Sequence, residues 1–195
     1  TLSQGFRNWS NLSPELGISW ELTSSSQHGN LISYNGWNNQ SPGTTAWLVS
    51  PVLDFTHVDR SALFFDVSYG YTPNKGNEVL QVWISEDCGE NFSRVIYERS
   101  GNALATSVTN QAWSPTNKRR EYVSLNTVAG LSDIRIAIVV INGQGNNLFI
   151  DNIEVFADDD PNPLSIADSF AIYPGGKNND DFSITFNLEE RQRVL

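Results

Sequence analysis

The segment from Asn146 to Phe156 limits what this chain can fold into more than any other. It follows the glycine-rich turn 143–145, and its apolar side chains alternate as in a β-strand up to Asp151 and Asn152. Beyond these two polar residues, the apolar positions fall on the opposite face of a straight strand. Such a slip in phase predicts either a β-bulge or a buried polar site, with Asp151 as the polar candidate.

The strand must end soon after Phe156. Residues 158–163 are rich in aspartate and contain two prolines, which donate no hydrogen bond to a sheet. We therefore expect a domain over residues 1–157 and a linker over 158–169. Residues 170–195 contain two further strand-like segments but are too few for a second core, so we expect a short strand pair there.

Other segments of the chain also have the composition of strands, and turn residues separate them. They are Trp47–Phe55, Ala62–Tyr71, Val79–Ser85, Arg94–Arg99, Glu121–Leu125 and Asp133–Ile141. In the last of these, one face is uniformly apolar, whereas the other begins polar at Asp133 and Arg135 and then turns apolar. No run of a dozen residues has a helical period. The pattern predicts an all-β fold, a jelly-roll β-sandwich of two antiparallel sheets.

Charge and composition exclude several classes of function. The 195 residues carry a net charge of −10, which repels phosphate backbones, so we expect no nucleic-acid partner. No apolar run approaches the roughly 20 residues that cross a bilayer, so we expect no membrane span. The chain begins without methionine or a signal-peptide pattern, and we expect it to be a piece of a longer protein.

The sequence lacks the motifs of the common hydrolases. Its two histidines, His28 and His57, form no His-Glu-x-x-His pair, and there is no Gly-x-Ser-x-Gly motif or phosphate-binding loop. The lone cysteine, Cys88, lies in an acidic turn that disfavours a thiolate. Asp54, Asp66 and Asp151 have no spacing that marks a pair of catalytic carboxylates. We therefore expect a protein that is not an enzyme.

Four segments occur in an order that resembles a known family. They are Trp47–Phe55, Leu63–Val67, Val82–Phe92 and Leu148–Ile153. Together they are similar to MAM-like or cleaved-adhesin jelly-roll domains of secreted bacterial proteins, over about residues 5–157. The Asp-Cys-Gly turn at residues 87–89 is similar to the version found beside cytophagalysin-type metallopeptidases.

This resemblance implies a non-catalytic accessory or adhesion module, secreted or held at the cell surface. Its partner would be a glycan, a cell-surface protein or an upstream catalytic domain of the same polypeptide. The alternative is a purely structural C-terminal domain that stabilises a secreted metallopeptidase. Residues 170–188 resemble the opening of a type IX secretion sorting domain, although that family usually has Asn-Pro where this chain has Gly175-Gly176. The second resemblance implies the export route.

The resemblance also implies a metal, since related jelly rolls often hold calcium at an aspartate of the closing strand. Asp151, with Asn152 beside it, occupies that position, and Glu21 is a weaker candidate partner. Ala46 stands where family members commonly carry an acidic residue. A hydrogen-bonded, structural Asp151 is the alternative, because a buried carboxylate needs some compensation.

A second candidate calcium site lies in the oxygen-rich loop 74–78, which contains Asn77 and Glu78 and is expected to face Gly145 and Asn146. Solvated loop tips are the alternative.

Aromatic side chains in polar loops are the candidates for binding a sugar. Trp37 and Asn38 lie in such a loop, and Tyr69, Tyr71 and Trp113 are weaker candidates. The tryptophans within apolar runs are expected in the core instead. They are Trp20, Trp47 and Trp83.

Overall fold

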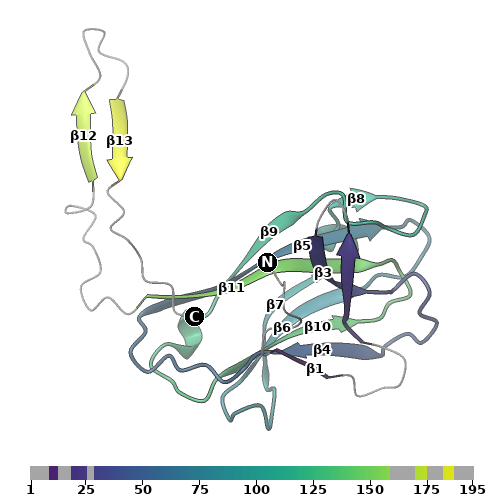
Figure 1. The fold of residues 1–195 in the computed structure, drawn as a ribbon, viewed down its shortest axis with the longest axis horizontal. Coiled ribbons are helices and arrows are strands. Elements are labelled where there is room, and N and C mark those ends of the chain that lie inside the picture. The colour runs from purple at the N-terminus through teal and green to yellow at the C-terminus, as the bar shows by residue number, and fades with distance from the viewer. Residues whose placement is uncertain (1–8, 13–18, 26–28, 159–169, 175–181, 187–195) are drawn as a thin grey trace.

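The computed structural model describes residues 9–12, 19–25, 29–158, 170–174 and 182–186. Within these ranges the chain forms a sandwich of two curled sheets, which confirms the predicted all-β jelly roll (Figure 1). The first sheet is antiparallel throughout. Its strands, in spatial order, are β1 (Ser10–Leu12), β4 (Thr45–Val49), β10 (Arg135–Ile141), β6 (Val79–Ser85) and β7 (Arg94–Ser100).

The second sheet packs against the first and places its longest strands at its centre. Its main strands, in spatial order, are β2 (Glu21–Ser25), β3 (Gly29–Tyr34), β11 (Leu148–Asp158) and β5 (Arg60–Tyr71). Two further strands pair with β5: β9 (Arg119–Ser124) antiparallel and the short β8 (Ser107–Val108) parallel. The helices of the described chain are α1 (Gly101–Leu104) and the 3-10 turn η1 (Asn126–Val128). Neither has the length or apolar character to cross a membrane.

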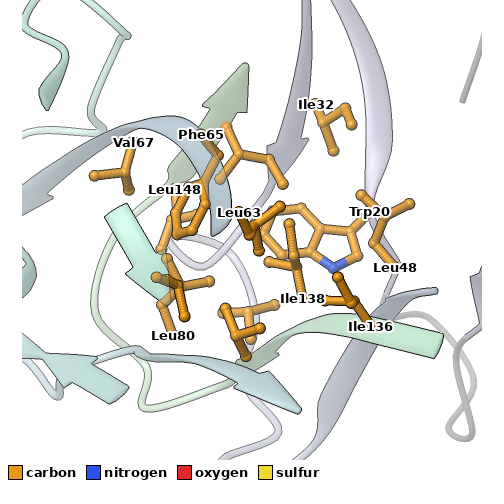
Figure 2. Packing of buried hydrophobic residues seen from close by; sticks show 14 of the residues in the cluster. Trp20, Ile32, Leu48, Leu63, Phe65, Val67, Leu80, Ile136, Ile138 and Leu148 are labelled. Atoms are coloured by element: carbon orange, nitrogen blue, oxygen red, sulfur yellow. The ribbon is translucent and has the colours of Figure 1, made fainter. Parts of the chain in front are cut away.

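The inner faces of both sheets supply one core, as the alternation of the sequence predicts. The apolar residues of β10 that share a face, from Ile136 to Val140, are fully buried and meet the inner side chains of β5 and β6 (Figure 2). Trp20 closes one side of this core and donates its indole N–H to the carbonyl oxygen of Ala46 at 3.1 Å. The prediction that Trp20 is a core residue is therefore confirmed.

The predicted strand Trp47–Phe55 is shorter in the structure. β4 ends at Val49, because Pro51 has no N–H to donate to a ladder. The chain returns to the sheet at Leu53, whose N–H donates to the carbonyl oxygen of Ile134 at 2.8 Å. An isolated bridge thus replaces the second half of the expected strand.

The two strands expected after the linker are present. They are β12 (Phe170–Pro174) and β13 (Phe182–Phe186), and they pair with each other in an antiparallel hairpin. β11 runs on to Asp158, and the rest of the expected linker lies outside the described residues. The division into segments 1–157, 158–169 and 170–195 stays a prediction.

The phase slip in the closing strand is a β-bulge. The register between β11 and β5 shifts between Asp151 and Glu154, and Asn152 adopts a positive φ of 48°. Because the bulge inserts one residue, Ile150 before it and Ile153 after it both pack against the same core. The bulge therefore keeps one face of β11 apolar along its whole length.

We predict that the backbone of Asn152 decides which substitutions this position accepts. Asn152→Gly and Asn152→Val both lose the hydrogen bond from the side-chain amide to Asp66, so they differ mainly in tolerance of positive φ. We expect the valine variant to be less stable than the glycine variant by about 1–2 kcal/mol, measured by urea unfolding. Equal stabilities would show that the bulge relaxes at no cost.

Candidate functional site

Loop 74–78 faces Gly145 and Asn146, as the sequence predicts. Glu78 is fully buried there, and its carboxylate accepts hydrogen bonds from the backbone N–H groups of Gly145 and Asn146, both at 2.9 Å. The Tyr69 hydroxyl donates a third bond at 2.8 Å. Burial raises the pKa of Glu78, because removal from water disfavours the charged carboxylate. Donor groups thus surround the carboxylate and tie two loops together.

Asn77 contributes to the contact between loop 74–78 and the turn 143–145 mainly through its backbone. A Cβ added to Gly143 would lie 1.8 Å from the carbonyl oxygen of Asn77, so the two loops pack in direct contact. Among the described residues, no three histidine, cysteine or acidic side chains come together as they would around a metal. Calcium at Asn77 and Glu78 stays a prediction.

The loops that carry Trp37 and Trp113 lie next to each other. The Asn147 side chain links them, accepting from the backbone N–H of Trp37 and donating to the carbonyl oxygen of Trp113, both at 3.2 Å. The Lys75 ammonium lies 3.4 Å from the centroid of the Trp37 ring. Trp113 donates its indole N–H to Ser68 at 3.0 Å. Both rings are partly buried and already have partners within the chain.

The remaining predicted sugar-binding residues differ in exposure. Asn38 is exposed in the same loop as Trp37. Tyr71 is half-buried and packs against the core. Tyr69 is fully buried, with its hydroxyl bonded to Glu78, so the expectation that it contacts a surface ligand is wrong. Its place on the inward face of β5 is the reason.

Asp151 is buried beside the bulge and forms an ion pair with Lys118. The Lys118 ammonium lies 2.7 Å from its carboxylate, and the backbone N–H of Asn152 donates to it at 2.8 Å. Asp66, its partner across β5 and β11, is engaged instead by Arg120 at 3.3 Å. The compensation that a buried carboxylate needs therefore comes from Lys118 in this structure. Calcium at Asp151 and Asn152 stays a prediction.

Glu21 does not supply a further buried carboxylate. It lies in β2 and is exposed to solvent.

An aromatic cluster on the outer face of the first sheet was missed at the sequence level. Trp47 on β4, Trp83 on β6 and Phe92 in the β6–β7 turn cover Ala137 and Val139 of β10. The ring centroid of Trp47 lies 5.8 Å from that of Trp83 and 5.4 Å from that of Phe92. The expectation that Trp47 and Trp83 belong to the central core is therefore wrong, because both point away from it. We call these three rings the outer aromatic cluster.

The orientation of both indoles is fixed in the same way. Trp47 donates its ring N–H to the Thr45 hydroxyl at 3.0 Å, and Trp83 donates its ring N–H to the Gln81 side-chain oxygen at 2.8 Å. In each case the acceptor precedes the tryptophan by two residues and so shares its face of the strand. These bonds hold both rings against the sheet.

A signal for this cluster was present in the sequence. The outward face of Asp133–Ile141 begins polar and then turns apolar, at Ala137 and Val139. A sandwich strand that is apolar on both faces needs a cover on its outer side. Tryptophans on neighbouring strands are the side chains large enough to provide one.

We predict that the Glu78 carboxylate is a structural acceptor. In Glu78→Gln the side-chain NH₂ would face one of the two backbone N–H groups, leaving a buried donor without an acceptor. The free energy of unfolding should fall by about 1–3 kcal/mol in urea unfolding. Glu154→Gln, a control at an exposed ion pair with Arg120, should change it by no more than about 0.5 kcal/mol. Equal effects of the two substitutions would contradict this role.

We also predict that Lys118 stabilises the fold through Asp151. Lys118→Met would leave a carboxylate with little access to water, since 9% of the Asp151 side chain is exposed. A loss of about 1–3 kcal/mol is expected, measured by chemical unfolding, because Lys118 itself lies partly in solvent. The double variant with Asp151→Asn should recover part of that loss. No loss in the single variant would contradict the prediction.

The calcium prediction at Asp151 is tested by a chelator. If calcium is bound, a chelator lowers the melting temperature of the wild type and leaves that of Asp151→Ala nearly unchanged. Identical melting of the wild type with and without chelator would contradict it.

Comparisons with known proteins show what the fold resembles. No family model matches the chain, and no curated protein matches it in sequence. Among solved structures, the K3 cleaved adhesin domain of Lys-gingipain from Porphyromonas gingivalis W83 is 16% identical, with a TM-score of 0.54 over 76% of this chain and 91% of that one. The K1 domain of the same protein is 15% identical, with a TM-score of 0.51 over 77% and 91%.

The K2 cleaved adhesin domain of Lys-gingipain is 20% identical, with a TM-score of 0.50 over 77% of this chain and 90% of that one. At such identities the likeness establishes the fold and leaves the function to the site. The chain has the fold of these cleaved adhesin domains.

Proposed function

We propose that this chain is a non-catalytic binding module of a secreted or cell-surface protein. Its ligand would be a glycan or a surface protein, bound through the outer aromatic cluster. The export route, by type IX secretion, rests on the resemblance of residues 170–188 alone.

One observation carries the proposal: the outer face of the first sheet presents Trp47, Trp83 and Phe92 where a sandwich ordinarily presents polar side chains. The three rings are half-buried and lie together, and a contiguous apolar patch on a surface is typical of an interaction site. The fold shared with domains that are named adhesins supports the same proposal.

The contacts of the three aspartates that a hydrolase could have used support a module without catalysis. Asp66 and Asp151 face each other across β5 and β11, and each is engaged by its own cation, Arg120 or Lys118. Asp54 accepts hydrogen bonds from the backbone and hydroxyl of Thr56 in an exposed turn. These contacts give each carboxylate a structural role.

The alternative, a structural C-terminal domain of a metallopeptidase, would use the same aromatic cluster differently. An upstream domain of the polypeptide would then cover the rings, and the module would bind no separate ligand. Binding of the isolated chain to a glycan or surface protein separates the two functions.

The test uses the full chain on a glycan array and on immobilised bacterial surface proteins. We expect binding to at least one class, weakened at least tenfold in Trp47→Ala and in Trp83→Ala. Tyr122→Ala is the matched control, because Tyr122 is an exposed aromatic on the other sheet. Failure of the wild type to bind either class, or binding that both tryptophan variants keep, would contradict the proposal.

A further inference from the structure

The outer aromatic cluster is the centre of a longer apolar strip. In the register of the first sheet, Leu12 on β1 lies beside Trp47, and Val95 on β7 lies beside Trp83, so both share the outer face. Leu12 is 52% exposed and Val95 is 38% exposed. The strip crosses every strand of the first sheet, which spans about 19 Å at the usual strand spacing. The shape suits an extended ligand lying across the strands.

The strip carries hydrogen-bonding groups beside its rings. Gln81 donates from its side-chain amide to the Glu98 carboxylate at 2.5 Å while it accepts from Trp83. Glu98 is exposed at the edge strand β7. A carboxylate can accept about four hydrogen bonds, so Glu98 has acceptor capacity for hydroxyl groups of a ligand.

The charge of the strip disfavours an anionic ligand. Glu98 is acidic, and the whole chain has a net charge of −10. The nearest cationic side chain on the outer face of β10, Arg135, is directed to the Ser50 carbonyl oxygen at 3.4 Å and packs where Gly89 leaves room. The charges of this strip therefore favour a neutral or basic ligand.

The shape of the rings and the acceptors beside them favour the neutral ligand. Both indole N–H groups are already bonded within the chain, so the tryptophans offer a ligand apolar ring surface and no free donor. Rings held in place lose little conformational entropy on binding. A flat apolar face flanked by hydrogen-bond acceptors matches a pyranose ring, which has an apolar C–H face and hydroxyl groups around its edge.

We infer that the strip across the first sheet binds a neutral, linear polysaccharide, with its sugar rings stacked on Trp47 and Trp83 and a hydroxyl group donating to Glu98. This inference rests on the proposed binding function and names its ligand class and its residues. A surface protein as the ligand would leave the proposed function standing and overturn this inference.

The experiment is affinity electrophoresis of the full chain in native gels. The gels contain soluble xylan, galactan or mixed-linked β-glucan as neutral polysaccharides, and polygalacturonate as the acidic one. We expect retardation by at least one neutral polysaccharide and none by polygalacturonate. Trp83→Ala should weaken the retardation at least tenfold, and Glu98→Ala at least threefold.

Two controls locate the site. Tyr122→Ala on the other sheet and Trp37→Ala in the loop should be retarded as the wild type is, with folding of every variant checked by circular dichroism. Loss of retardation in Trp37→Ala alone would overturn the inference by moving the site to the loops. Retardation by polygalacturonate alone, or by no polysaccharide, would also overturn it. Binding of the same chain to immobilised surface proteins then decides whether the broader proposal fails as well.

Discussion

The central strand β10 is apolar on both faces, and each face requires its own apolar cover. Its inward residues join the core between the sheets, whereas Ala137 and Val139 face outward and would meet water if nothing covered them. Trp47 and Trp83 from the flanking strands provide the cover. The rings that cover these side chains are themselves half-buried, so an apolar patch remains on the outer face of the sheet.

Two polar features position the rest of the sandwich. The bulge at Asn152 returns the apolar side chains of β11 to the core, so that the closing strand stays in register with β5. Glu78 joins two loops at one end by accepting hydrogen bonds from backbone groups and from Tyr69. Both features hold the sheets in place.

Much of the fold could be predicted from the sequence because period-two alternation is a local signal. It located β5, β6 and β10 and the slip at Asp151. Alternation does not tell which of two apolar faces turns inward, so Trp47 was placed in the core. Tyr69 was a candidate because it is aromatic, but in the strand it shares a face with Phe65 and Val67, and that face lies in the core.

The most direct measurement is ¹⁹F NMR of the chain labelled with 5-fluorotryptophan, with each signal assigned from a single Trp→Phe variant. The signals are followed as the neutral polysaccharide that retards the chain is added. We predict that the signals of Trp47 and Trp83 shift together with saturation, whereas that of Trp20, buried in the core, stays fixed. Shifts confined to Trp37 and Trp113, or no shift at any tryptophan, would contradict a binding site on the first sheet.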